Sequence, residues 1–325
     1  MRIIFMGTPA LAAKCLLGLH QAGYEIPLVV TQPDRPKGRG RKLAFSPVKE
    51  LALNLGLEIY QPEKLKHEAA IEMLRQYKPD LIVVAAFGQI LPKAVLDLPP
   101  LGCINVHASL LPAYRGAAPI QWALLDGLSE TGVTIMLMEE GLDTGPMLLQ
   151  KSIAINKTMT GEQLYNALAE LGTVALLESI PLWAAGKLTP IPQQAELASY
   201  AVRIERQHER IDWQLTAASL DRQIRTFYPW PGASTQWQDK EVKLLQAELL
   251  SAEASAAYLQ GWQANHPDET WLPGMVLSLI RNQGIVVQTG EGALLVTRVQ
   301  PVGKQPMDGA SFVNGYRLSV GDKFQ

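Results

Sequence analysis

The residues best suited to chemistry lie in one short stretch, NVHASLLPAYRG, which covers residues 105–116. Asn105 and His107 come at the end of the apolar run GCINVH, and an apolar loop that contains a proline follows them. An amide that donates hydrogen bonds and an imidazole that exchanges protons, placed beside an apolar wall, suit a binding or catalytic site. The stretch therefore predicts a site in which His107 is the central group.

A third candidate is Asp143, which lies in the segment EEGLDTGPMLLQ, where the chain bends between two glycines before the next strand. A functional interpretation brings Asp143 against His107, where the carboxylate would orient the imidazole. The alternative is that Asp143 only caps its own turn, as Asp commonly does. Three polar residues on the strand-exit side of one sheet, Asn105, His107 and Asp143, favour the functional interpretation.

The elements that must position these residues follow an alternating pattern. Buried-strand patterns such as RIIFMG, PLVVTQ, DLIVVAAFG and GCINVH are separated by helical segments such as SPVKELALNLG and HEAAIEMLRQY. This alternation predicts an α/β fold with a doubly wound, mostly parallel, Rossmann-like sheet. Ligands of such sheets bind beyond the carboxyl ends of the strands, where His107 lies. Thr8 and Pro9 predict the start of the first helix, with Thr8 as its N-cap.

Several classes of protein are disfavoured. The turn GTPALA has one glycine and lacks the dinucleotide-binding fingerprint, so we expect no dinucleotide cofactor. We also expect no metal, because the remaining histidines lack carboxylates or thiols at ligand spacing: His20, His67, His208 and His266. The two cysteines lie in apolar contexts, which indicates buried thiols rather than a disulfide or a nucleophile: Cys15 and Cys103.

Length and pattern together predict two domains. The 325 residues exceed the usual single-domain size. From about Arg206 the pattern becomes one helical segment followed by short strands with glycine turns, which predicts a small C-terminal β-barrel of the OB-like kind. We expect a catalytic domain over residues 1–188, a linker over residues 189–205 and the barrel domain over residues 206–325. No apolar run approaches the ~18 residues that span a bilayer, so we expect a cytoplasmic protein without membrane contact.

The strongest charge run is the basic loop, TQPDRPKGRGRK, which covers residues 31–42 and holds five basic residues against one acidic residue. A solvated loop is the simple interpretation of such a composition. The loop also follows the second strand, on the same edge of the sheet as the predicted site, where it would close over a phosphate-bearing substrate. The net charge of −2 gives no support to a globally basic nucleic-acid binder.

Taken together, these motifs resemble a known family. NVHASLLPAYRGAAPIQWALLDG, TGVTIM and GLDTGP are similar to the signature of the formyltransferases that use 10-formyltetrahydrofolate. GTPALA and the basic loop resemble the branch whose acceptor is initiator methionyl-tRNA, and IDW, IRTFYPWPGA and VQPVGK resemble the C-terminal domain of that branch. Two departures are Leu11, where the family often has an aromatic residue, and an Ala-rich stretch at 249–272 that looks like an insertion.

The resemblance implies a transferase of translation initiation that moves a formyl group from 10-formyltetrahydrofolate to the α-amino group of methionyl-tRNA. Asn105 would donate to the oxyanion of a tetrahedral intermediate, and His107 would polarise the carbonyl or accept the amine proton. Asp143 would hold His107 and take part in proton movement. The family's folate-binding segment corresponds to Ser109, Leu110, Leu111 and Pro112, although core packing of the leucines and a bracing role for the proline are compatible alternatives.

The resemblance further implies tRNA contact through the basic residues of the basic loop, with Arg39 central: Arg35, Lys37, Arg39, Arg41 and Lys42. We expect a monomer. Two other classes stay open at this point. A purine-pathway formyltransferase or a formyltetrahydrofolate hydrolase would share the central site without the basic loop and this C-terminal domain, and a non-catalytic folate or RNA binding module would need no aligned Asn, His and Asp.

Overall fold

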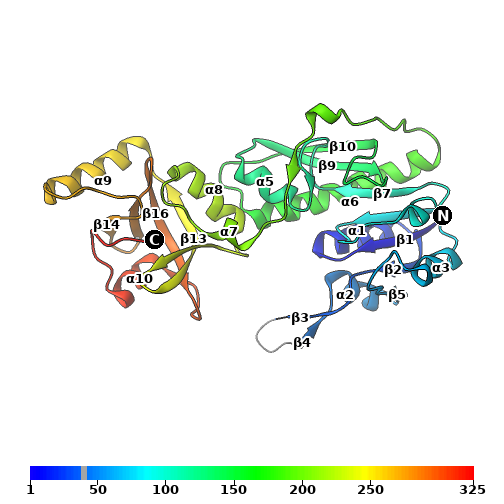
Figure 1. Cartoon of the computed structure of the whole chain (residues 1–325), viewed down its shortest axis with the longest axis horizontal. Helices are drawn as coiled ribbons and strands as arrows, with labels where there is room; N and C mark the ends of the chain where they lie inside the picture. Colours follow the sequence, from blue (N-terminus) through cyan, green and yellow to red (C-terminus); the bar gives the residue numbers. More distant parts are fainter. Residues whose placement is uncertain (38–41) are drawn as a thin grey trace. The chain divides into compact units, whose positions relative to one another are not determined.

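The computed structural model describes residues 1–37 and 42–325, and for residues 36, 37 and 42 the backbone alone. The chain divides into two compact units (Figure 1). The N-terminal unit comprises residues 1–120, 129–155 and 164–203, and the C-terminal unit comprises residues 121–128, 156–163 and 204–325. Two short excursions of the first half of the chain therefore belong to the C-terminal unit. The expected division at residues 188 and 205 stays a prediction, and residues 189–203 group with the N-terminal unit.

The N-terminal unit is built on one seven-stranded sheet, in the order β10 (Met147–Ala154), β9 (Glu130–Leu137), β7 (Cys103–His107), β6 (Leu81–Ala85), β1 (Arg2–Gly7), β2 (Glu25–Val30) and β5 (Ile59–Tyr60). The pairs from β7 to β5 are parallel, and the pairs of β9 with β7 and with β10 are antiparallel. The predicted doubly wound, mostly parallel sheet is confirmed. Runs of Ile, Val and Leu explain why the central strands β1 and β6 are buried on both faces.

Helices cover both faces of this sheet. On one face lie α3 (Glu68–Gln76) and α4 (Lys93–Leu96), whose Leu74 and Val95 share a cluster with Ile4 and Val84 of the sheet. Two further helices pack on each other: the Thr173 hydroxyl of α6 (Gly161–Ala184) lies 3.7 Å from the Cys15 sulfur of α1 (Ala10–Gln21). The remaining helices of this part of the chain are α2 (Pro47–Asn54), α5 (Pro119–Leu125) and the 3-10 turn η1 (Ala195–Leu197).

Helix α6 lies directly against the strands that carry the site. A Cβ on Gly172 would be 2.9 Å from Val106 Cγ1, so only glycine allows this close approach to β7. The 24-residue α6 is also long and apolar enough to cross a membrane by length and composition, a test that the core helix of a soluble protein passes as well. The expectation that no segment reaches this threshold is therefore wrong, although Leu168, Leu176 and Ile180 are buried within the unit.

The connection after β1 differs from the expected capping pattern. Helix α1 begins at Ala10 with Pro9 as its N-cap, and no side chain caps it. The Thr8 hydroxyl instead donates to the Phe87 carbonyl at 3.1 Å and accepts from the Gln32 N–H at 3.4 Å. Thr8 thus joins the exits of β1, β2 and β6 at the edge of the sheet where ligands of this fold bind.

Two small sheets lie outside the main one. A hairpin of β3 (Arg35–Lys37) and β4 (Lys42–Ala44) frames the basic loop. A parallel pair joins β8 (Arg115–Gly116) to β11 (Tyr200–Ala201), although 85 residues separate Arg115 from Tyr200 in sequence. The second pair attaches the segment after α6 to the loop after β7.

The C-terminal unit is an antiparallel sheet in the order β12 (Ala233–Trp237), β13 (Lys240–Leu249), β16 (Ala293–Pro301), β15 (Gly284–Gln288) and β14 (Val276–Ile280), with β17 (Met307–Asp308) beside β16. The chain end closes it, because Gln325 exchanges backbone hydrogen bonds with Gln236 of β12 and Asp322 accepts from Val276 of β14. The predicted small β-barrel is confirmed. Its helices are α7 (Arg206–Glu209), α8 (Ala217–Phe227), α9 (Ala252–Asn265) and α10 (Gly309–Tyr316).

The barrel interior is aromatic. Trp213, Trp237 and Phe312 surround Phe324, with ring centroids 5.5–6.4 Å apart, and Trp213 Nε1 donates to Thr235 at 2.9 Å. The Ala-rich stretch at 249–272 forms α9, whose N-cap is Ser251. Its Trp262 belongs to a second apolar cluster with residues of β14, β15 and β16. The Ala-rich stretch therefore covers an outer face of the barrel sheet.

Candidate active site

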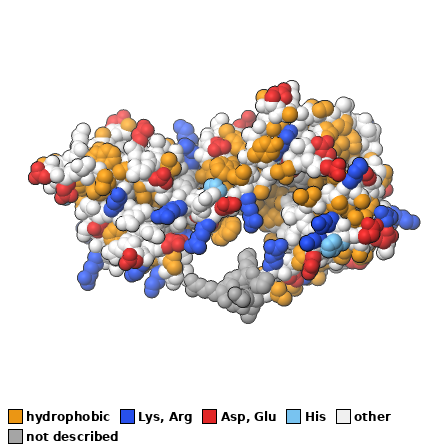
Figure 2. Space-filling model, viewed as in Figure 1, with side chains coloured by type: hydrophobic (Ala, Val, Ile, Leu, Met, Phe, Trp, Pro, Cys, Tyr) orange, Lys and Arg blue, Asp and Glu red, His pale blue; other side chains and the backbone are white. Residues whose placement is uncertain are grey.

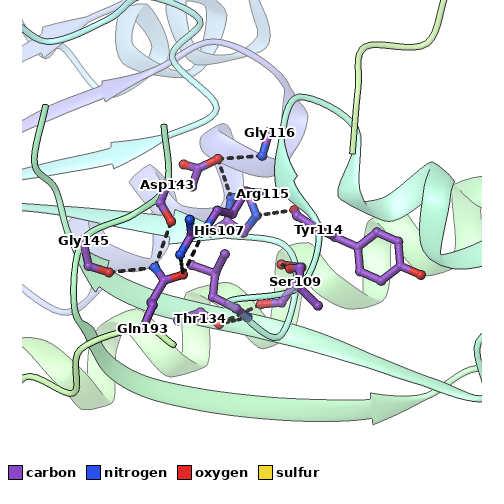
Figure 3. Close-up of polar contacts among 11 residues, drawn as sticks. His107, Ser109, Tyr114, Arg115, Gly116, Thr134, Asp143, Gly145 and Gln193 are labelled. Carbon is purple, nitrogen blue, oxygen red and sulfur yellow. Dashed lines mark hydrogen bonds and ion pairs between the residues drawn. The ribbon is translucent and has the colours of Figure 1, made fainter. Parts of the chain in front are cut away.

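His107 ends β7 with 5% of its surface exposed, paired with Thr134 of β9. Its Nε2 lies 2.9 Å from the Tyr114 carbonyl oxygen (Figure 3). Because a carbonyl oxygen can only accept, Nε2 carries the proton and donates. The other ring nitrogen, Nδ1, lies 3.6 Å from Asp143 Oδ2. Proton exchange at this imidazole therefore belongs to the Nδ1 side, which Asp143 shares.

Asp143 is held by the loop that follows β7. Its Oδ2 accepts a hydrogen bond from the Gly116 N–H at 2.8 Å (Figure 3). The residue has a φ of 52°, in the left-handed region that Asp tolerates better than most residues. The 3.6 Å separation from His107 exceeds a hydrogen bond and becomes an ion pair when the imidazole is protonated. The structure therefore places Asp143 against His107, as the functional interpretation of the sequence expects.

Asn105 precedes His107 by two residues on β7, so both side chains point to the same face of the sheet. It is 9% exposed. Within residues 1–37 and 42–325, no hydrogen-bond partner occupies its side-chain amide, and its amide atoms are not sealed from solvent. An amide in this state can donate to a substrate oxygen without first breaking a bond within the protein.

The loop after β7, residues 108–118, is called the site loop below. Thr134 donates to the Ser109 carbonyl at 2.7 Å and accepts from the Leu111 N–H at 3.1 Å, while Gln150 donates to the Leu111 carbonyl at 2.9 Å. Ser109 is buried and donates to the Ala113 carbonyl, and Leu111 is buried as well. Leu110 and Pro112 are half-buried. Hydrogen bonding and packing thus account for Ser109 and Leu111, and Leu110 also packs close to Gly132 of β9, where a Cβ would lie 2.5 Å from Leu110 Cδ2.

The basic loop lies at the exit of β2. Arg35 is exposed and lines a pocket of about 690 Å³ with Thr8, Gln32, Phe45, Phe87 and Arg203, at the carboxyl ends of β1, β2 and β6. Lys37 and Lys42 are backbone partners in the β3–β4 hairpin. Arg39 and Arg41 fall outside the described residues. Two arginines at an open pocket near strand exits suit a substrate that carries phosphate.

Sequence reasoning missed a group of residues that hold the site. Gln193 donates to the carbonyls of Asp143 at 2.8 Å and Gly145 at 2.7 Å, and accepts from Arg115 Nε at 3.0 Å and Nη2 at 2.7 Å (Figure 3). Arg115 is 5% exposed. Arg115 was within reach of sequence reasoning, because it lies in the site loop motif. Gln193 gave no signal, because its segment has two prolines nearby and little periodicity.

Other chemistry has little support in the part of the chain that the structure describes. No three His, Cys, Asp or Glu side chains gather there as metal ligands. Burial raises the pKa of the Cys15 thiol to about 11 and that of Cys103 to about 12, so both are protonated at neutral pH and poor nucleophiles. A side-chain triad of amide, imidazole and carboxylate is what the site offers. Such a set suits transfer of an acyl-type group to an amine, where charge develops on one oxygen.

The N-terminal unit thus carries a polar triad on a doubly wound sheet, and the C-terminal unit is a closed barrel. Residues 1–180 match the family model described as formyl transferase, and residues 203–317 match the formyl transferase C-terminal domain. The chain therefore belongs to the formyl transferase family, and it is an enzyme of this type.

Relatives of high identity extend over nearly the whole chain. A methionyl-tRNA formyltransferase of Pseudoalteromonas translucida is 47% identical over 97% of this chain and 94% of its own length. One of Neisseria meningitidis serogroup A is 44% identical over 99% of this chain and 100% of its own length. Methionyl-tRNA formyltransferases of Symbiobacterium thermophilum and Myxococcus xanthus are 45% and 44% identical to this chain.

Solved structures share the fold. HypX from Aquifex aeolicus in complex with tetrahydrofolic acid is 20% identical, with a TM-score of 0.64 over 99% of this chain. This chain spans about half of that structure, 48% of its length. A methionyl-tRNA formyltransferase from Clostridium thermocellum is 16% identical, with a TM-score of 0.55 over 77% of this chain and 94% of its own. At these identities the likeness concerns the fold alone.

Proposed function

We propose that this chain transfers the formyl group of 10-formyltetrahydrofolate to the α-amino group of the methionine carried by initiator methionyl-tRNA. The observation that carries the proposal is the likeness of 44–47% to methionyl-tRNA formyltransferases over nearly the full chain. The position of Asp143 supports it as well. An Asp that only caps its own turn would not be expected to lie against an imidazole, and Asp143 Oδ2 lies 3.6 Å from His107 Nδ1.

The reaction joins the amine nitrogen to the formyl carbon. The amine lone pair forms the new C–N bond, the carbonyl electron pair moves to oxygen, and the amine loses a proton. Collapse of the tetrahedral intermediate returns the pair from oxygen and breaks the bond to N10, which takes up a proton as tetrahydrofolate leaves. The protein must therefore hold an oxyanion, remove one proton and supply one proton.

We assign the oxyanion to Asn105, because its amide is unoccupied among the described residues. One such preorganised donor is worth about 3 kcal/mol in the transition state. We assign proton movement to His107 Nδ1 and Asp143, since Nε2 is engaged by the Tyr114 carbonyl at 2.9 Å. The Gly116 N–H keeps the Asp143 carboxylate turned toward the imidazole.

Substrate contacts complete the proposal. We assign the folate to the segment of Ser109, Leu110, Leu111 and Pro112, with Leu110 and Pro112 as the side chains exposed enough to touch it. We assign tRNA contact to the basic loop: Arg35, Lys37, Arg39, Arg41 and Lys42. Arg35 and Arg203 at the pocket beyond β1 and β2 support phosphate binding there. We further propose a cytoplasmic monomer that uses no metal.

Three acceptors separate this function from its alternatives. Release of tetrahydrofolate from 10-formyltetrahydrofolate is measured with initiator methionyl-tRNA, with glycinamide ribonucleotide and with water alone. We expect turnover with the tRNA only. Turnover with the ribonucleotide would make the chain a purine-pathway enzyme, turnover in water a hydrolase, and no turnover with folate binding a non-catalytic module.

A further inference from the structure

The segment from Ile191 to Ala201 lies along the active site and is hydrogen-bonded to it. Ile191 exchanges two backbone hydrogen bonds with Met147 at 2.8 and 2.9 Å. The Ser199 carbonyl accepts from Arg115 at 2.8 Å, and the Ala201 carbonyl accepts from Ala117 at 3.0 Å. This segment therefore spans both walls of the site: the turn that carries Asp143 and the site loop.

Gln193 is the side chain of this segment that joins the two walls. Its amide has two N–H donors and two acceptor lone pairs. The donors reach the carbonyls of Asp143 and Gly145, and the oxygen accepts from two nitrogens of the Arg115 guanidinium (Figure 3). All four positions are used, so the amide fixes the turn and the arginine with respect to each other.

Both of these partners bear on the Asp143 carboxylate. The turn is held in a conformation that costs energy for a residue other than glycine, because the φ of Asp143 is 52°. Arg115 precedes Gly116, whose N–H donates to Asp143 Oδ2 at 2.8 Å. Gly145 is close-packed as well, since a Cβ there would lie 1.9 Å from the Leu137 carbonyl oxygen. Gln193 thus acts on the Asp143 carboxylate in two ways. It holds the backbone of the turn that carries Asp143, and through Arg115 it holds the segment whose Gly116 N–H donates to the carboxylate.

We propose that Gln193 is a positioning residue for formyl transfer: it aims the Asp143 carboxylate at His107 Nδ1. The inference rests on the proposed function, because it presupposes that Asp143 takes part in proton movement. Gln193 touches no reacting atom. A loss of alignment of about 1 Å can cost on the order of 100-fold in rate, so the effect belongs to kcat rather than to substrate binding.

The test compares Gln193→Ala with Gln194→Ala, a neighbouring glutamine whose side chain is exposed. Steady-state kcat and KM are measured for both substrates, together with the melting temperature. For Gln193→Ala we expect kcat to fall on the order of 10- to 100-fold, with each KM within about twofold of wild type. Gln194→Ala should match wild type. Unchanged kcat, or a rise in KM that accounts for the whole effect, would overturn the proposal.

Gln193→Glu separates positioning from simple stability. A carboxylate keeps the contact with Arg115 but has no N–H for the carbonyls of Asp143 and Gly145, so the protein stays packed while the turn loses its donors. We expect kcat to fall as far as in Gln193→Ala. A Gln193→Glu protein with wild-type kcat would contradict the proposal, even if Gln193→Ala failed to fold.

A double-mutant cycle with Asp143→Asn separates the positioning role of Gln193 from the proposed catalytic role of Asp143. If Gln193 acts through Asp143, adding Gln193→Ala to Asp143→Asn should lower kcat by less than about twofold, because the carboxylate is already gone. An undiminished effect in that background would place Gln193 elsewhere in the mechanism. If Asp143→Asn alone left kcat unchanged, the proposed role of Asp143 would fail, whatever Gln193 does.

Discussion

The site loop and the basic loop leave the same edge of one sheet, after β7 and β2, and are held in opposite ways. The site loop is joined to β9, β10 and residues 199–201 by hydrogen bonds, and its Ser109 and Arg115 are buried. The basic loop is anchored at its base, where Asp34 pairs with Lys49 and Gln61, and the flanking Leu43 and Phe45 are exposed. Fixed geometry suits bond making, whereas a charged segment next to the exposed side chains of Arg35, Leu43 and Phe45 suits recognition of a large partner.

The charged surface fits this contrast. Lys and Arg side chains are visible on the face of the N-terminal unit that Figure 2 shows, interspersed with Asp and Glu rather than gathered into one field. A net charge of −2 agrees with this mixture. Binding of an anionic partner must therefore come from local groups such as Arg35 and Arg203 at their pocket.

The largest expected effect concerns Asn105, which lies on β7 before the site loop. Asn105→Ala removes the proposed oxyanion donor and should lower kcat on the order of 100- to 1000-fold with little change in either KM. Asn105 lies in the middle of the buried strand β7, so circular dichroism and the melting temperature must show that the sheet survives. Asn105→Ala with near-wild-type kcat would remove this residue from the mechanism.

Gly116→Ala should break the fixed geometry through the backbone. A Cβ at Gly116 would lie 2.8 Å from the Ala201 carbonyl oxygen, at a φ of 116° that disfavours side chains. The β8–β11 pairing and the N–H that holds Asp143 would both shift, so we expect kcat to fall at least about tenfold. Gly261→Ala is the control, because a Cβ there meets open space and alanine favours the helix. Equal kcat in both variants would mean that the site loop tolerates movement.

The basic loop should affect recognition instead of bond making. Arg39→Ala and Arg35→Ala should each raise KM for methionyl-tRNA several-fold and flatten its salt dependence, while KM for the folate stays within about twofold. Kinetics at two salt concentrations beside a folate titration measure this. If either variant weakened folate binding as much as tRNA use, its arginine would belong to the folate pocket.

The smallest expected effect concerns the anchor of the basic loop. Hydrogen bonds from Lys49 and then Gln61 lower the pKa of Asp34 below its ordinary value of 3.8. A carboxyl with a lowered pKa stabilises the fold above its unfolded pKa, and that stability is lost as the pH falls through the folded pKa. Asp34→Asn should therefore destabilise by about 1 kcal/mol at pH 7 and by less near pH 3.

Chemical unfolding of wild type and Asp34→Asn at both pH values checks this expectation. Asp97→Asn is the matched control, because its pair with Lys93 is largely exposed and should contribute almost nothing. A loss of stability for Asp34→Asn that was independent of pH would rule out the carboxylate as its cause.

The sheet and the barrel were predictable from the sequence because local pattern determines them. Apolar runs such as those ending at Val30 and His107 are long and rich in β-branched residues, and the barrel strands are separated by glycine turns. We expected His107 and Asp143 together because parallel strands end on one edge, but β9, the strand before Asp143, is antiparallel to β7 and ends beside Ile104. The turn that carries Asp143 therefore folds back to reach His107. The structure then supplied the distance of 3.6 Å, which no local pattern contains.

The remaining features depend on tertiary contacts. Thr8 looked like a helix cap, yet its hydroxyl bonds to Phe87, 79 residues away. Gln193 reaches Arg115 across 78 residues, and its four hydrogen bonds are to groups that only the folded chain brings together. Helix α9 had a local signal that could have been used, because Ser251 precedes a stretch rich in alanine, a strong helix former.

We propose that His107 and Asp143 act as one unit in formyl transfer to methionyl-tRNA. The most direct test is the single-turnover rate of formyl transfer, with both substrates saturating, for wild type, Asp143→Asn, His107→Gln and the double variant. Asn keeps the left-handed backbone at 143 and removes only the charge. We predict that each single variant slows transfer on the order of 100-fold or more and that the double variant is little slower than the worse single one. Additive losses, or transfer at the wild-type rate in either single variant, would contradict the account.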